Sequence, residues 1–177
     1  MITDALVNFI PPGAPLSLIT GATTSVYSNI YDIAGVGVGQ PTGNIIGTRT
    51  LFGQDIGIGG NKPLLDVVVG TAFVGASASL NVQFQGAPDT SNNQPGTWAT
   101  LVETGPIAVG SLTAAQIIAR FDFPPAFPAG TLPRYLRLAF AVTGGSGFTA
   151  GTIAFAIVTM ARDDYSAAYA AKNFTVA

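Results

Sequence analysis

The sequence contains neither cysteine nor histidine, and these two absences limit the metal sites and the catalytic reactions that its side chains can support. Without cysteine the chain has no disulfide framework and no thiolate ligand for a metal. Without histidine it lacks the commonest general base, the commonest metal ligand and the side chain that changes charge near neutral pH. We therefore expect no metal, no cofactor and no histidine-based catalysis.

Charged side chains are also scarce. Asp, Glu, Lys and Arg make up 9% of the 177 residues, whereas they account for roughly a quarter of an ordinary soluble domain. Seven basic and nine acidic residues form no basic stripe, which argues against nucleic acid as a partner. A polybasic membrane anchor is missing as well, so no membrane partner is expected. Apolar residues reach 48%, and such a surface favours association over solvation.

The first segment, MITDALVNFIPPGAPLSL, has Asp4 and no basic residue before its apolar stretch. It therefore does not resemble a secretory signal, and we expect no export. Pro11 and Pro12 forbid a continuing helix. We predict an extended N-terminal arm over residues 1–20 and a C-terminal tail over residues 161–177.

Glycine, proline and short apolar runs are abundant and predict an all-β chain. Residues 79–86 alternate cleanly, with an apolar set predicted to face inward and Asn81, Gln83 and Gln85 outward. We expect this strand to pair with the apolar strand predicted over residues 64–75. About eight such strands fit one domain over residues 1–177, a jelly-roll-like two-sheet antiparallel β-sandwich.

The uncharged stretch after Arg137 is long enough to span a bilayer, but Thr143 to Gly147 is a cluster of turn residues that a spanning helix does not need. Period-two alternation on both sides of the turn predicts two strands. The bulky set predicted to face a core is Leu136, Leu138, Phe140, Val142, Ile153, Phe155 and Ile157. The interleaved set is small and mostly uncharged, which is unusual for a face open to water. We expect that face to be covered by a partner.

No residue pattern predicts a catalytic site. Asp163 and Asp164 are neighbours, but adjacent side chains do not face each other on a strand or a helix, so helix capping is the better interpretation. Trp98, the only tryptophan, is predicted to open a strand and pack into the core, and the alternative is a platform for stacking a sugar. We predict that the chain is not an enzyme, and a hydrolase using carboxylates alone is the least favoured alternative.

Five segments carry a resemblance to a known family: MITDALVNFIPPGAPLSL, QPGTWATLVETG, RFDFPPAFPAG, PRYLRLAF and FTAGTIAFAIVT. The chain resembles the capsid cement proteins of tailed bacteriophages, the family typified by the Bordetella phage cement protein. The resemblance implies a non-enzymatic jelly-roll protein that forms homodimers and clamps neighbouring major capsid protein subunits. It also implies a place on the exterior of the virion, after synthesis in the bacterial cytoplasm. The family has no catalytic residues to transfer.

Contact residues cannot be transferred from the resemblance, so the partner-facing residues are predicted from this sequence alone. They are aromatic and aliphatic side chains near the two ends: Ile2, Leu6, Phe9, Tyr165, Tyr169 and Phe174. The alternative is that both ends pack on their own sandwich. A second function, a carbohydrate-binding sandwich or virion adhesin, remains open because jelly rolls also serve lectins.

Overall fold

The computed structural model describes residues 3–19, 24–33, 44–46, 49–50, 63–90, 94–123, 125 and 133–160. These residues contain one short 3-10 helix, η1 (Val109–Ser111), and no α-helix. The strands are β1 (Thr3–Ile10), β2 (Leu16–Ser17), β3 (Ser25–Tyr27), β4 (Tyr31–Asp32), β5 (Asn44–Ile46), β6 (Arg49–Thr50), β7 (Pro63–Val69), β8 (Ser79–Ala87), β9 (Ala99–Ala108), β10 (Ile117–Asp122), β11 (Tyr135–Thr143) and β12 (Thr152–Met160).

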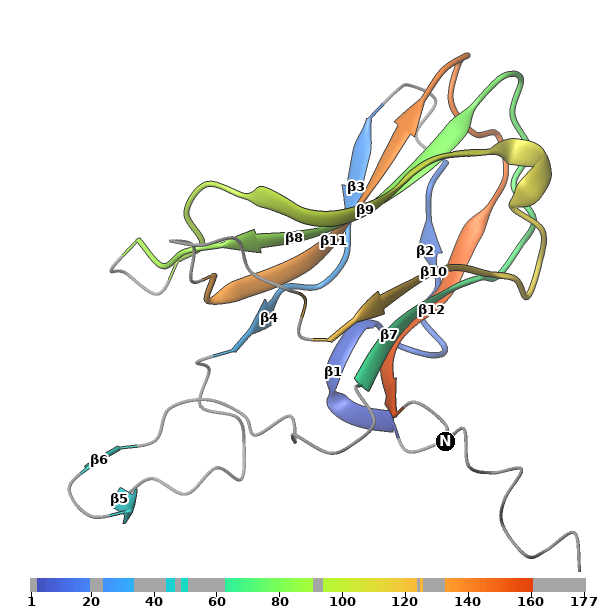
Figure 1. The fold of residues 1–177 in the computed structure, drawn as a ribbon. Coiled ribbons are helices and arrows are strands. Elements are labelled where there is room, and N and C mark those ends of the chain that lie inside the picture. The colour runs from blue at the N-terminus through green and yellow to red at the C-terminus, as the bar shows by residue number, and fades with distance from the viewer. Residues whose placement is uncertain are drawn as a thin grey trace, which may run out of the picture.

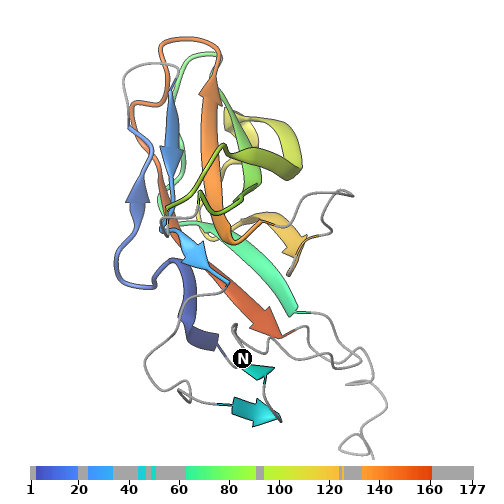
Figure 2. The ribbon, with the colours of Figure 1, turned by 90° about the vertical axis from the view of Figure 1, so that its left-hand side faces the viewer.

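Two antiparallel sheets face each other as a sandwich (Figures 1 and 2). Sheet A has the order β1-β12-β7-β10, and β2 also pairs with β12. Sheet B has the order β3-β11-β8-β9, and β4 also pairs with β11. The short strands β5 and β6 pair only with each other.

The strand order is that of a jelly roll. When β1, β3 and β7 to β12 are numbered 1 to 8 along the chain, sheet A reads 1-8-3-6 and sheet B reads 2-7-4-5. This alternation between sheets is how eight strands form two interlocked Greek keys. The predicted jelly-roll-like two-sheet sandwich is confirmed.

Strands that follow each other in sequence mostly lie in opposite sheets. The predicted pairing of the strands at 64–75 and 79–86 is wrong, because β7 pairs with β10 and β12 while β8 pairs with β9 and β11. The two strands around the turn at 143–147 are likewise not hydrogen-bonded to each other. Each carries bulky apolar residues on one face, and two facing sheets bury both faces in a single core.

The inward set of β11 is confirmed, because its four predicted core residues are at most 2% exposed. In β12, Ile153 and Ile157 are buried as predicted, but only Ile153 belongs to the core cluster between the sheets. The register against β7 shifts between Ile153 and Phe155, and Ala156 and Val158 join the core cluster beyond that point. A bulge of this kind exchanges the two faces of a strand, so Phe155 is only half-buried.

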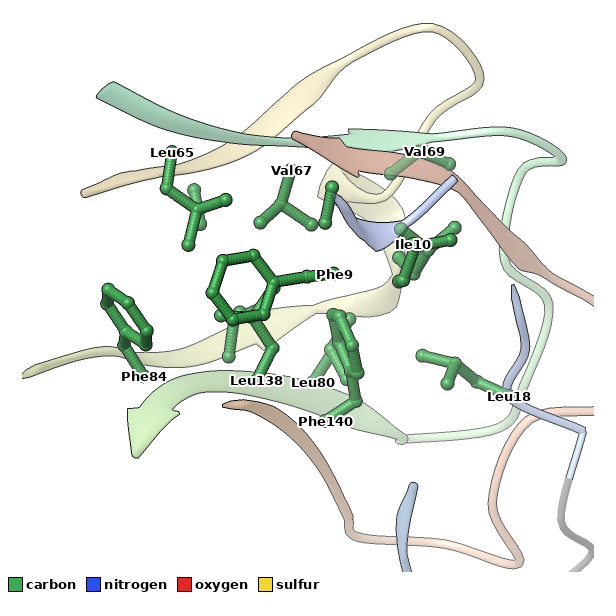
Figure 3. Close-up of a cluster of buried hydrophobic side chains, with 14 of the residues drawn as sticks. Phe9, Ile10, Leu18, Leu65, Val67, Val69, Leu80, Phe84, Leu138 and Phe140 are labelled. Atoms are coloured by element: carbon green, nitrogen blue, oxygen red, sulfur yellow. The ribbon is translucent and has the colours of Figure 1, made fainter. Parts of the chain in front are cut away.

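The core lies between the sheets and takes side chains from both (Figure 3). Its fully buried members include Leu65, Val67, Leu80, Phe84, Leu138 and Phe140. Within it, Phe9 meets Phe84 edge to face with ring centroids 5.6 Å apart, and Phe84 stacks on Phe123 at 6.2 Å. Edge-to-face and offset-stacked rings are the arrangements that the ring quadrupole favours.

The N-terminal segment is part of the sandwich, which corrects the prediction of an arm over residues 1–20. Strand β1 is an edge strand of sheet A and pairs with β12. Phe9, Ile10 and Leu18 are buried in the core cluster, so the segment is held by its own apolar side chains as well as by the sheet. The predicted C-terminal tail, residues 161–177, lies outside the described residues.

Ala115 is strained, and its replacement by glycine is expected to stabilise the fold. Its φ is 62° in the turn between η1 and β10, where its N–H donates to the carbonyl of Val69 at 2.9 Å. Removing the Cβ relieves about 1–2 kcal/mol of left-handed strain, and glycine's greater freedom in the unfolded chain returns part of it. We expect the free energy of unfolding, measured by urea unfolding, to rise by about 0.5–1 kcal/mol. The neighbouring Ala114→Gly, with no positive φ to relieve, is the control and is expected to lose stability.

Candidate binding surface

The described part of the chain brings none of the predicted partner-facing residues together on a surface. Ile2, Tyr165, Tyr169 and Phe174 lie outside the described residues, and Leu6 lies in β1 with its side chain outside the described part. The prediction for Phe9 is corrected. Its side chain is 1% exposed and packs against Tyr31, Phe84 and Phe123 in the chain's own core, as the alternative interpretation of the N-terminus expected.

The outer face of sheet B carries a different group of side chains, which we call the polar face. No described element lies over this side of the sheet (Figures 1 and 2). The polar face is made by Tyr27, Asn81, Gln83, Gln85, Trp98, Glu103 and Arg137.

The guanidinium of Arg137 is held between two aromatic rings. Its central carbon lies 3.8 Å from the ring centroid of Tyr27 and 4.0 Å from that of Trp98. A planar cation over ring faces is attracted by the ring quadrupole. Burial lowers the pKa of Arg137, although the arginine stays charged at neutral pH.

Trp98 therefore lies at the surface, which corrects the prediction that it packs into the core. It is half-buried beside Arg137 and directly precedes β9. The core on the inner side of sheet B is filled by the inward side chains of β8 and β11. The turn-rich segment before Trp98 does not indicate which way the Trp98 side chain points. The side chain that it contacts, Arg137, lies on a strand that is distant in sequence.

A chain of hydrogen bonds runs along the polar face from Arg137 to Glu103. Arg137 Nε donates to Gln85 Oε1 at 2.9 Å, and Gln85 Nε2 donates to Gln83 Oε1 at 3.1 Å. Gln83 Nε2 donates to Glu103 Oε2 at 3.0 Å, and Asn81 Nδ2 donates to the same oxygen at 2.8 Å. From the cation to the carboxylate, every donor points the same way, so neighbouring bonds polarise one another.

Strand register places these side chains. The outward positions predicted for Asn81, Gln83 and Gln85 are confirmed by the inward burial of the residues between them. Gln85 stands opposite Arg137 on β11, and Gln83 stands opposite Glu103 on β9. Ala139 lies between Gln83 and Tyr27 in the pairing and is 1% exposed. Longer side chains from neighbouring strands thus cover Ala139, whereas Ala141 is half-buried.

Glu103 is an exposed carboxylate with a lowered pKa, caused first by the hydrogen bond from Asn81 and then by that from Gln83. Both bonds favour the ionised form. The second oxygen, Oε1, accepts no hydrogen bond from the described residues. Glu103 is therefore anionic and open to a ligand at neutral pH.

The other arginines with described side chains are structural. Arg134 donates from Nε and Nη2 to the two oxygens of Asp32, both at 2.9 Å, and from Nη1 to Asp89 at 2.6 Å. Arg120 Nε lies 2.6 Å from Asp66. The hydrogen bond to Asp32 is the first cause of the raised pKa of Arg134, and that to Asp66 is the first cause for Arg120. These pairs tie separate strands and loops together.

No described helix is long and apolar enough to cross a membrane. In the part of the chain that the structure describes, no three His, Cys, Asp or Glu side chains gather as a metal site. A family model described as Bbp16 matches residues 41–157, which include every residue of the polar face except Tyr27. The name of this family derives from a Bordetella phage. No curated protein matches the chain.

Proposed function

The chain belongs to the Bbp16 family, and from this membership we propose that it is a structural virion protein that binds the outside of a bacteriophage capsid as a cement protein. In this role it bridges major capsid protein subunits and stabilises the shell without catalysis. Family membership is the observation that carries the proposal. The jelly-roll sandwich supports it, because a rigid body with two broad sheet faces suits binding to an assembled surface.

Binding alone suffices for stabilisation. A ligand that binds only the assembled shell adds about 2.7 kcal/mol per site when its free concentration is roughly a hundred times the dissociation constant. Many copies on one shell multiply this effect. A homodimer adds to it further, because the second contact of a bridging pair forms at a high effective concentration.

Addition of the purified protein to undecorated shells of its phage tests this function. We expect saturable co-sedimentation, ordered density on the outer surface in cryo-electron microscopy and a higher temperature of shell disruption. Shells that already carry their full complement are the control and should take up no more protein. Absence of co-sedimentation at saturating protein, with an unchanged disruption temperature, would contradict the proposal.

A second candidate function, a carbohydrate-binding or adhesin module of the virion, is favoured by one observation. Trp98 and Tyr27 lie at the surface beside a row of amide side chains instead of in the core. Jelly-roll domains serve as lectins as well as capsid proteins. The two functions are compatible, since one face can hold a shell while another meets a ligand.

A further inference from the structure

Arg137 differs from the other arginines whose side chains are described. Arg120 and Arg134 each have carboxylate partners, whereas no described carboxylate lies within ion-pair distance of Arg137. The side chain is nonetheless half-buried between two rings. A partly desolvated cation without a counter-charge gains most from an anion supplied by a ligand.

The surroundings of Arg137 define the shape of that anion. The rings of Tyr27 and Trp98 hold the guanidinium plane, and Gln85 accepts from Nε. Donors on the terminal nitrogens remain, and their fork matches the two oxygens of a carboxylate. The site is fixed before the ligand arrives, so little side-chain entropy is lost on binding.

The rest of the polar face matches sugar hydroxyls. Gln83 and Gln85 are two residues apart on one side of β8, and their amides are oriented by the chain of hydrogen bonds. An amide both donates and accepts, as a hydroxyl does. Glu103 Oε1 is a further acceptor, and Tyr27, a residue 47% exposed, offers an apolar surface to a sugar ring beside Arg137.

A protein partner fits this face less well. The centre of a protein interface is apolar and poor in charged groups. Here the centre is made of amides, one cation and one carboxylate, and Ala139 beneath them is covered. Tyr27 is the one exposed large apolar side chain among the residues that define the face.

We propose that the polar face of sheet B binds a carbohydrate that carries a carboxylate, such as a uronic or sialic acid, with Arg137 pairing with the carboxylate and the amides of β8 meeting the hydroxyls. The proposal rests on the second candidate function and is independent of shell binding. If the chain also decorates a shell, its many copies convert a weak affinity for acidic surface glycans into avidity.

Titration calorimetry on the folded full chain tests the proposal with two acidic probes, tetragalacturonic acid and 3′-sialyllactose. Each has a neutral counterpart, the methyl-esterified tetragalacturonate and lactose. We expect one or both acidic probes to bind, the neutral counterparts to bind at least about tenfold more weakly, and affinity to fall as salt increases. Binding of one probe and not the other distinguishes uronic from sialic acid. Failure of both, or equal binding of the neutral sugars, overturns the proposal.

Two variants locate the binding on the polar face. Arg137→Gln is expected to lower affinity for the acidic probe about tenfold or more. Glu103→Gln keeps an oxygen that can accept from Asn81 and Gln83, and its amide nitrogen can still donate to a sugar hydroxyl in place of the acceptor Oε1. It removes a negative charge that repels an acidic ligand, so affinity for the acidic probe should rise. A merely structural role for Glu103 predicts no gain. Retained melting temperatures establish that both variants are folded.

Shell binding distinguishes the two functions. If the protein binds shells but neither acidic probe, the cement function stands and the carbohydrate site is wrong. If Arg137→Gln abolishes uptake on shells or changes the oligomeric state while sugar binding is absent, the polar face is a protein contact and the proposal is overturned. If sugar binding is unchanged in Arg137→Gln, the site lies elsewhere, and the assignment to this face is overturned.

Discussion

Replacing Phe9 by alanine is expected to lower the free energy of unfolding by about 3–5 kcal/mol, the range measured for removing a large aromatic side chain from a core. The ring is 1% exposed. It meets Phe84 edge to face at 5.6 Å and Phe123 at 6.1 Å. Truncation therefore removes apolar burial and leaves a cavity between the two sheets. Since domains are typically stable by about 5–15 kcal/mol, urea unfolding should show a large shift of the midpoint.

Ile19→Ala is the matched control for this experiment. Ile19 also belongs to the N-terminal segment, follows β2 and is 54% exposed. Its truncation should change stability by no more than about 0.5 kcal/mol. Equal, small effects of the two substitutions would mean that β1 contributes little to the core, and that the segment is an arm after all.

The same contacts decide how a test of the N-terminus in shell binding must be designed. Deleting residues 1–10 removes β1 together with Phe9 and Ile10, both buried in the core cluster. Loss of shell binding by such a deletion would report loss of the sandwich as readily as loss of a contact. Substitutions of exposed side chains in the same segment that keep the core intact, such as Ile19→Ala, separate the two effects.

Local patterns predicted the strands well, because side chains two residues apart on a strand point to the same face of the sheet. The alternation in β8 and β11 correctly separated Phe84 and Phe140 from Gln83 and Arg137. The same rule failed in β12 after Ile153, because a register shift adds a residue that the alternation does not reveal. For Phe9, the pattern showed an apolar segment but not what would cover it.

The polar face was beyond prediction because its contacts are distant in sequence. Arg137 and Gln85 are separated by 52 positions, and Gln83 and Glu103 by 20. They meet only because β8 lies between β9 and β11, and that order was not evident when β7 was expected beside β8. A signal did exist: three amides alternate along β8. The register of β8 against β9 and β11 brings Glu103 and Arg137 beside these amides, and the sequence alone does not give that register.

Gly151→Ala is expected to be the other large loss, because the glycine combines two constraints. Its φ is +135°, a conformation that side chains with a Cβ rarely adopt, and a Cβ built there overlaps the ring of Phe73. That ring is 6% exposed and lies 4.7 Å from the ring of Phe148, so it has little room to move. Backbone strain costs about 1–3 kcal/mol, and overpacking costs about 1–3 kcal/mol more.

Two other glycines separate these contributions under the same urea unfolding measurement. Gly105 has a φ of +73° but open space around a Cβ, so Gly105→Ala should cost only the backbone strain, about 1–2 kcal/mol. Gly110 lies in η1 with open space and no positive φ, so Gly110→Ala should be neutral or slightly stabilising. We expect the order Gly151, Gly105, Gly110 from largest loss to smallest. A loss at Gly151 no greater than at Gly105 would show that Phe73 yields to the new methyl group, and that this end of the core is looser than its ring contacts indicate.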